Sequence, residues 1–519
     1  MISLNMDKYG LQRSLLLVTD WTWRNFKKPL TITDLYIKLI TLGSKNIIMK
    51  RSILPVFLLI FLVSVPATGQ NQIDKHLLEG SWMGKLNVSS ISLRIIFNLS
   101  LTGMDSIAVT LDSPDQGAKN IKIGPVSTDN EKIRISAPLI AGEYNGVLKN
   151  DTLIDGIWTQ GGNSLPLVLT KLRKAFTLNR PQEPKPPFPY LSEDVYFANE
   201  KAGIKLAGTL TIPEGDGPFP AVIMITGSGS QNRNEELLGH KPFLIIADYL
   251  SRVGIAVLRY DDRGVGQSQG TPLNTTSADF AADAEAAFLY MQKRDLIDKD
   301  HIGLVGHSEG GFIAPMVASA NPGIAFIISL AGTGVPGDQI LHRQNRDISL
   351  MSGAKESEVN NAVAINKKLF AVLKKETDNK KAEAEIAEVY RKALKKQKKS
   401  DEEIDKEVKQ LNASLNPVAY NWMRYFITTN PADFWEKVKC PVLALNGEKD
   451  LQVAADVNLP AIEKALRSGG NTKVKTIIFP DLNHLFQHCK TGLPSEYGEI
   501  EETFSPEVLV VISDWIQNL

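Results

Sequence analysis

The chain has 519 residues, and its 58 lysines and arginines balance 58 aspartates and glutamates, so its formal net charge is zero. This length predicts two or three domains, because single domains rarely exceed about 250 residues. The balanced charge argues against a nucleic-acid-binding protein, which would need a basic surface for phosphate contacts. A hydrophobic content of 43% is that of a globular protein and argues against a disordered or multi-span membrane protein.

Residues 1–69 are predicted to be an upstream segment followed by a secretory signal peptide. Met49 begins a basic stretch, an apolar run follows at 53–65, and small residues continue to Gly69. This order is typical of signal peptides. The apolar run is shorter than the roughly 20 residues that span a bilayer, although a single membrane anchor is the alternative. We therefore expect translation to begin at Met49, cleavage near Gly69, export (periplasmic or secreted) and no stable membrane span in the mature form.

Residues 76–173 are predicted to form a small antiparallel β domain. Short, partly alternating apolar runs are separated by turn residues at regular intervals, which favours a barrel or a sandwich. No group of residues in this segment suggests catalysis, so we expect a structural or substrate-presenting role. A proline-rich linker at 174–190 follows and marks the domain boundary.

From residue 191 to the C-terminus the pattern becomes α/β. After an antiparallel opening, apolar runs alternate with helical segments, which predicts a mostly parallel sheet with helices on both faces. The expected strands are 204–212, 221–225, 255–260, 302–305, 325–330, 442–445 and 474–479, and the expected helices are 241–252, 277–293, 308–320, 455–467 and 506–517.

A long insertion at about 335–435 separates two of the expected strands. It is rich in Lys, Glu, Ala and Leu, which favours helices. The charged run at 395–409 is interpreted as a solvated helix face. Because the insertion leaves and rejoins the same sheet next to the candidate nucleophile, we expect it to be a lid.

The segment Gly306-His307-Ser308-Glu309-Gly310 has the G-x-S-x-G pattern of a nucleophile elbow. The turn between strand and helix is so tight that a side chain two positions before or after the serine would collide with the backbone, so glycine is needed at both. An apolar strand precedes this segment and a small-residue helix follows it, as the motif requires. We therefore predict Ser308 to be a nucleophile.

A serine nucleophile needs a base, and the base needs an acid that orients it. In this type of fold the chain order is Ser, then Asp or Glu, then His. Asp450 follows the end of one expected strand and His484 follows the end of the next. We predict Asp450 to be the orienting acid and His484 the general base, with Glu448 and Asp481 as competitors for the role of the acid.

An oxyanion intermediate needs two backbone N–H donors. The first expected donor is Glu309, directly after the nucleophile. The second is Ser228, with Gly229 as the alternative, in the glycine-rich loop after the strand at 221–225. Asp262 and Arg263, in a nearby turn, are expected to pair as scaffold.

The sequence does not predict a metal site or a disulfide. His484 and His488 have the spacing of metal ligands, but the glutamate of the H-E-x-x-H motif is missing. Cys440 and Cys489 match neither zinc-finger nor C-x-x-C spacing, so two free thiols are expected.

Residues 191–519 resemble the α/β-hydrolase superfamily, whereas residues 1–190 do not. The motifs that carry the resemblance are Gly227–Gly229, Arg259–Ser268 and Gly306–Gly311. They are similar to those of bacterial serine carboxylesterases related to the dienelactone-hydrolase and prolyl-oligopeptidase-like branches.

This resemblance implies an α/β-hydrolase fold and ester hydrolysis through an acyl-enzyme, without a metal or an organic cofactor. Ser308, Asp450 and His484 stand where the family's triad stands. We therefore expect an exported serine esterase that hydrolyses small carboxylic (acyl or acetyl) esters as small-molecule substrates; the sequence predicts neither its preference among acyl and alcohol groups nor its oligomeric state. One alternative is a prolyl-oligopeptidase-like serine peptidase, although such enzymes carry a repeated propeller domain that this N-terminal segment lacks. Another is a non-enzymatic binding protein, which should lack a triad member.

Overall fold

The computed structural model describes residues 73–88, 91–102, 106–116, 118–161, 163–414 and 417–519. The predicted signal peptide lies outside these residues and stays a prediction. None of the helices in the described ranges has the length and apolar character that crossing a membrane requires.

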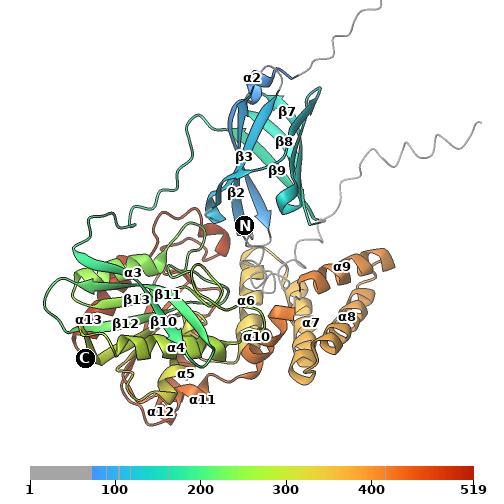
Figure 1. The fold of residues 1–519 in the computed structure, drawn as a ribbon. Helices are drawn as coiled ribbons and strands as arrows, with labels where there is room; N and C mark the ends of the chain where they lie inside the picture. Colours follow the sequence, from blue (N-terminus) through green and yellow to red (C-terminus); the bar gives the residue numbers. More distant parts are fainter. Residues whose placement is uncertain (1–72, 89–90, 103–105, 117, 162, 415–416) are drawn as a thin grey trace, which may run out of the picture.

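The N-terminal part of the described chain is one antiparallel sheet of nine strands. Figure 1 draws it in blue and teal. It begins after the short helix α2 (Lys75–Leu78). The strands are β1 (Gly80–Val88), β2 (Ile91–Leu101), β3 (Ile107–Ser113), β4 (Ala118–Lys122), β5 (Val126–Asp129), β6 (Lys132–Ala137), β7 (Gly142–Asn150), β8 (Leu153–Gln160) and β9 (Asn163–Lys171). Their order in the sheet is β4-β3-β2-β1-β9-β8-β7-β6-β5.

This sheet curls around a core of its own. The ring centroids of Phe97 on β2 and Tyr144 on β7 are 5.6 Å apart, although three strands separate β2 from β7 in the sheet. Phe97 also contacts Trp158 on β8, at 6.0 Å. The predicted antiparallel β domain is therefore confirmed, and it includes β4 and β5, which lie outside the apolar runs of the sequence. These two were missed because both are short strands at the ends of the sheet without an alternating apolar pattern.

The second sheet has eight strands and forms the centre of the C-terminal part. The strands are β10 (Tyr190–Asn199), β11 (Ile204–Pro213), β12 (Phe219–Ile225), β13 (Ala256–Tyr260), β14 (Ile297–His307), β15 (Ile327–Leu330), β16 (Val442–Gly447) and β17 (Val474–Phe479). Their order is β10-β11-β13-β12-β14-β15-β16-β17. β11 pairs antiparallel with β10 and β13, and the other neighbours are parallel.

Helices cover both faces of this sheet (Figure 1). On β12, Ile223 belongs to the apolar core shared with one set of helices, and Val222 belongs to the core on the opposite face. The strand reads as a continuous apolar run because both of its faces are buried. The helices of the first set are α4 (Ser277–Met291), α5 (Gly310–Ala320) and α12 (Ala455–Ser468), and those of the second are α3 (Pro242–Arg252) and α13 (Pro506–Gln517).

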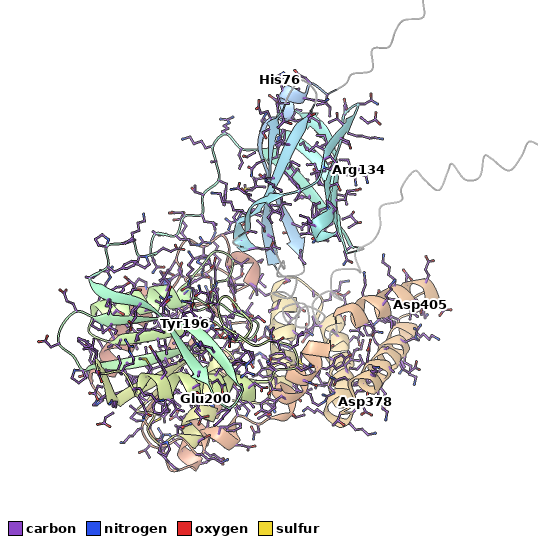
Figure 2. All side chains as sticks on the ribbon, viewed as in Figure 1. His76, Arg134, Tyr196, Glu200, Asp378 and Asp405 are labelled. Atoms are coloured by element: carbon purple, nitrogen blue, oxygen red, sulfur yellow. The ribbon has the colours of Figure 1, made fainter. Side chains whose placement is uncertain are left out.

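The segment between β15 and β16 is helical. Its apolar side chains share a cluster with Phe312 and Met316 of α5, so the helices rest on the helix that follows the elbow. The outer end of this helical segment is charged and exposed, and Figure 2 shows Asp405 at its surface. The helices are α6 (Gly337–Met351), α7 (Glu356–Lys375), α8 (Asn379–Lys396), α9 (Asp401–Ser414), α10 (Pro417–Thr428) and α11 (Ala432–Trp435).

The β domain contacts the loop that precedes α13. Arg94 on β2 forms an ion pair with the buried Asp115 and donates from Nη2 to the carbonyl oxygen of Gly498, at 2.8 Å. Arg180 in the linker donates to the same carbonyl oxygen at 3.2 Å. These bonds hold the β domain on the segment that follows His484. A small apolar cluster lies at the same contact and consists of Leu93, Leu237, Leu238, Leu485 and Tyr497.

Candidate active site

Ser308 lies in a strained turn between β14 and α5. Its φ is +53°, and its backbone N–H donates to the carbonyl oxygen of Leu330 at 2.8 Å. A Cβ atom at Gly306 would lie 2.1 Å from the carbonyl oxygen of Gly310, and one at Gly310 would lie 2.1 Å from that of Ile225. Both glycines are therefore required by close backbone approach. The turn has the geometry of a nucleophile elbow.

His484 and Asp450 form a buried hydrogen-bonded pair. His484 Nδ1 lies 2.8 Å from Asp450 Oδ2, and both residues are at most 5% exposed. The other oxygen of Asp450, Oδ1, accepts the backbone N–H groups of Gln452 and Val453, each at 2.8 Å. These two donors hold the carboxylate in one orientation, with Oδ2 towards the imidazole. The contact with Asp450 in turn fixes the orientation of the His484 ring.

The competing acids have other partners. Asp481 is exposed and forms an ion pair with Lys449 at 2.6 Å, while Glu448 Oε2 accepts the backbone N–H of Asp481 at 3.3 Å. His488, four positions after His484, contacts Glu502 through Nδ1 at 2.9 Å. The two histidines therefore interact with different carboxylates. Cys440 and Cys489 are both free, as predicted.

A small pocket lies at the elbow. Ser308 lines it together with Ser228 and Glu309, the two residues predicted to supply oxyanion donors. The space open to water-sized molecules is about 40 Å³, which is room for only a few waters. The helical segment supplies much of the apolar wall. The remaining lining residues are Thr333, Ile340, Leu341, Gln344, Trp422, Phe426, Gln452 and Val453.

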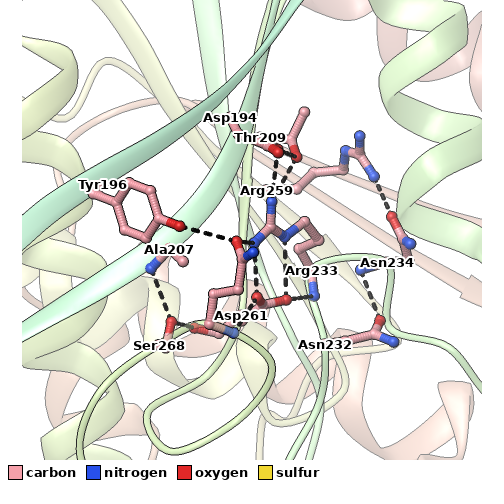
Figure 3. Close-up of polar contacts among 11 residues, drawn as sticks. Asp194, Tyr196, Ala207, Thr209, Asn232, Arg233, Asn234, Arg259, Asp261 and Ser268 are labelled. Carbon is pink, nitrogen blue, oxygen red and sulfur yellow. Dashed lines mark hydrogen bonds and ion pairs between the residues drawn. The ribbon is translucent and has the colours of Figure 1, made fainter.

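Two aspartates after β13 hold the loop that contains Ser228. Asp262 Oδ2 accepts the backbone N–H of Gln231 at 2.8 Å. Asp261 Oδ1 accepts the backbone N–H of Arg233 at 2.9 Å, and its Oδ2 pairs with the Arg233 guanidinium at 2.8 Å, as Figure 3 shows. The loop is therefore anchored at two backbone positions.

The expected Asp262–Arg263 pair is wrong. Arg263 Nε instead bonds Asp283 on α4 at 2.7 Å. Asp262 is occupied by Gln231 and by the hydroxyl of Thr226, which donates to Oδ1 at 2.8 Å. Adjacent residues in this turn therefore serve different elements, which a sequence pattern does not reveal.

Glu309 has a buried side chain that connects the elbow to the helical segment. Its Oε1 accepts from Ser277 Oγ on α4 at 2.6 Å and from Trp422 Nε1 on α10 at 2.7 Å. Burial raises the pKa of this carboxyl. The sequence predicted a role for the backbone of Glu309 but not this side-chain contact.

His307 and Glu235 form a second buried pair beneath the elbow. His307 Nδ1 lies 2.9 Å from Glu235 Oε1, and Nε2 lies 3.0 Å from the carbonyl oxygen of His484. Burial is the largest single influence and lowers the pKa of His307, but Glu235, the carbonyl oxygen of His484 and Asp450 together raise it more, so the net shift is upward. Glu235 was not predicted from the sequence, where no motif marks it.

Comparison with known proteins gives both a family and individual relatives. The model of the X-Pro dipeptidyl-peptidase (S15) family matches residues 202–477, just over half of the chain. The chain is 25% identical over 310 residues to the esterase EstD of Thermotoga maritima. This match covers 58% of this chain and 64% of EstD. The chain is 32% identical over 130 residues to the 2,6-dihydropseudooxynicotine hydrolase of Paenarthrobacter nicotinovorans, a match that covers 25% of this chain and 33% of that hydrolase. Both matches thus span less than two thirds of the relative.

Among solved structures, Est1E of Butyrivibrio proteoclasticus with bound ferulic acid has a TM-score of 0.38 at 17% identity. That match covers 62% of this chain and 98% of Est1E. A hypothetical protein of Pseudomonas aeruginosa, PA2218, has a TM-score of 0.41 at 14% identity, covering 67% and 99%. Scores of this size support no inference about function.

Proposed function

Because the chain belongs to the X-Pro dipeptidyl-peptidase (S15) family of the α/β-hydrolase superfamily, we propose that it is a serine hydrolase that cleaves small carboxylic esters. The observation that carries the proposal is the buried hydrogen bond between His484 Nδ1 and Asp450 Oδ2. His484 also contacts His307, the residue directly before Ser308, through its carbonyl oxygen. Ser308, Asp450 and His484 follow the carboxyl ends of β14, β16 and β17, the edge of the sheet where this fold carries its active site, and this placement supports the proposal.

The proposed mechanism begins with proton transfer. With Nδ1 bound to Asp450, His484 Nε2 is the nitrogen available to take the proton of Ser308 as the serine oxygen attacks the ester carbonyl carbon. The backbone N–H groups of Ser228 and Glu309 stabilise the oxyanion. Protonated His484 then gives its proton to the alcohol that leaves, which produces the acyl-enzyme. Water, deprotonated by His484, releases the acid by the same route.

The size of the pocket favours short acyl groups. Little space is open beside Ser308, and Ile340, Leu341 and Phe426 of the helical segment narrow it with apolar side chains. A hydrophobic pocket discriminates between neighbouring chain lengths by about tenfold or more per methylene group. Acetyl and propionyl esters are the proposed substrates.

Ester hydrolysis is tested against the peptidase alternative, which the name of the family favours. We expect p-nitrophenyl acetate and propionate to be cleaved at least about a thousandfold faster than the octanoate, and an X-Pro-p-nitroanilide about a hundredfold more slowly than the acetate. The name of the Thermotoga relative supports this preference for esters. The measurement is kcat/KM for each substrate, with the Ser308→Ala chain as the background. Amide cleavage at a rate comparable to the best ester would instead make the protein a peptidase.

We propose further that α6–α10 form a lid, attached to the elbow by the Trp422–Glu309 hydrogen bond. Trp422→Phe removes the Nε1–H donor and leaves a buried carboxyl with one partner fewer, which costs about 1 to 3 kcal/mol. We expect a lower midpoint of urea unfolding and a chain-length optimum shifted to longer acyl groups. Trp515→Phe, on α13 and outside the pocket lining, is the matched control. If Trp422→Phe and the control both kept the acyl chain-length optimum of the wild type, the proposed lid would be contradicted.

A further inference from the structure

The imidazole of His307 lies between two hydrogen-bond acceptors. On one side Nδ1 faces a carboxylate oxygen of Glu235 at 2.9 Å, and on the other Nε2 faces the carbonyl oxygen of His484 at 3.0 Å. A neutral imidazole has one N–H donor and so can satisfy only one of two acceptors. Both contacts are hydrogen bonds only if the ring and the carboxyl together hold one proton more than a neutral imidazole and a carboxylate.

The carboxyl of Glu235 connects this ring to the loop that contains Gly227 and Ser228, called the oxyanion loop here because the proposed function assigns it an oxyanion donor. Its Oε1 accepts the backbone N–H of Gly227 at 2.6 Å as well as the His307 contact. A Cβ atom at Gly227 would lie 3.0 Å from that oxygen and 3.2 Å from Ser308 Cβ, so the loop backbone passes between the two side chains. Glu235 has a left-handed backbone conformation, with φ of +50°. Its side chain is buried, and Oε2 has no hydrogen-bond partner among the residues that the structure describes.

We propose that His307 and Glu235 are positioning residues that act as one protonated, formally neutral pair. The pair holds three segments in place relative to one another: the elbow, the oxyanion loop and the segment that contains His484. The inference rests on the proposed function, because it assigns those segments to catalysis. His307 precedes the nucleophile, Glu235 holds the oxyanion loop at Gly227, and His307 Nε2 holds the base segment at the carbonyl oxygen of His484. Neither residue donates a proton to the substrate.

Charge explains why the two side chains occur together. A lone buried imidazolium or carboxylate is expensive to desolvate, whereas the pair carries no net charge. The other titratable groups that face the ring are His484, with its ring centroid 4.8 Å away, and Asp450, which acts through space. Asp450 favours the protonated form of His307, so it also stabilises the pair.

The upward shift of the His307 pKa determines how the stability of the folded protein changes with pH. A histidine with a raised pKa contributes stability that is complete below its unfolded value of about 6.5. That stability is lost as the pH rises through the folded value. At pH 8, where an unperturbed histidine is neutral, the proposed pair still holds its extra proton, because the two hydrogen bonds of the His307 ring require it.

Glu235→Gln tests the pair with little change in shape. An amide carries no charge, so the second proton of His307 loses its counter-ion. The new amide can accept from Gly227 or donate to His307 Nδ1, but one of the three contacts must then fail. We expect kcat to fall by about ten- to a hundredfold while KM stays within about threefold, because misplaced catalytic groups reduce turnover more than binding.

A matched control is available on the surface. His301 Nδ1 lies 2.8 Å from Asp298 Oδ2 in an exposed pair of the same chemistry. Asp298→Asn removes the charge from that pair and is expected to leave kcat and KM unchanged. An equal kcat in Glu235→Gln and in wild type would overturn the proposal.

A second measurement needs neither substrate nor a folded variant. With 15N-labelled histidine in the full chain, we expect one of the seven imidazole rings to give two N–H signals at pH 8. If every ring shows a single protonated nitrogen at pH 8, the pair is not protonated and the proposal is wrong. This readout also distinguishes failure of the proposed hydrolase function from failure of the proposed His307–Glu235 pair. Retained ester hydrolysis in Ser308→Ala would contradict the proposed function but would not change the protonation of the His307 ring.

Discussion

Ser308→Ala is expected to lower kcat for p-nitrophenyl acetate by about a millionfold, the size of loss that removal of a catalytic serine produces. Alanine has no oxygen to form the acyl-enzyme, so His484 has no proton to accept. The backbone of the turn should be preserved, because its bond to Leu330 uses the backbone N–H of Ser308. The measurement is steady-state hydrolysis together with the pre-steady-state burst, which should disappear.

Ser319→Ala is the matched control for this change. Ser319 lies on α5, the same helix that follows the elbow, and its hydroxyl donates to the carbonyl oxygen of Met316 at 2.9 Å. We expect this variant to keep the rate and burst of the wild type. Activity above about one tenth of wild type in Ser308→Ala would show that another group is the nucleophile.

Asp450→Asn is expected to lower kcat by about ten thousandfold while KM changes little. The backbone N–H groups of Gln452 and Val453 require an acceptor at the Oδ1 position. The amide nitrogen of asparagine must therefore occupy the Oδ2 position, 2.8 Å from His484 Nδ1, and donate to it. This moves the ring proton of His484 to Nε2, which can then no longer accept the proton of the serine. The expected loss thus comes from the wrong tautomer in an intact fold.

Asp481→Asn gives the comparison. Asp481 was a competitor for the acid, but its ion pair with Lys449 is exposed, so we expect kcat within about twofold of wild type. Measuring kcat for both variants between pH 6 and pH 9 separates a tautomer effect from a shifted pKa. If Asp481→Asn lost as much activity as Asp450→Asn, the role of Asp450 as orienting acid would have to be given up.

The features that could be predicted from the sequence are local or follow from the topology of the sheet. The elbow consists of five consecutive residues between an apolar strand and a helix, so one short segment of the sequence predicts its geometry. Asp450 and His484 follow the ends of neighbouring strands, and the carboxyl ends of parallel strands meet at one edge. Their 2.8 Å contact thus joins two residues that the chain order had already selected.

The rest depends on contacts that no short pattern encodes. Glu235 reaches His307 across 72 positions, from a left-handed backbone conformation that a non-glycine residue rarely adopts. Arg263 bonds Asp283 on α4 rather than its neighbour Asp262, because the carboxylate of Asp262 already holds the loop that contains Ser228. Charge complementarity alone therefore pointed to the wrong partner.

The contact between Arg94 and Gly498 has a consequence for the order in which the protein assembles. The two residues are 404 positions apart. At a synthesis rate of about 5 to 20 residues per second, Gly498 is added roughly 20 to 80 s after Arg94. During this interval the β domain has its own core, which includes Trp82, Phe97 and Tyr144, but not this contact. The contact that holds the β domain on the segment after His484 therefore forms only after the strands of both sheets have been synthesised.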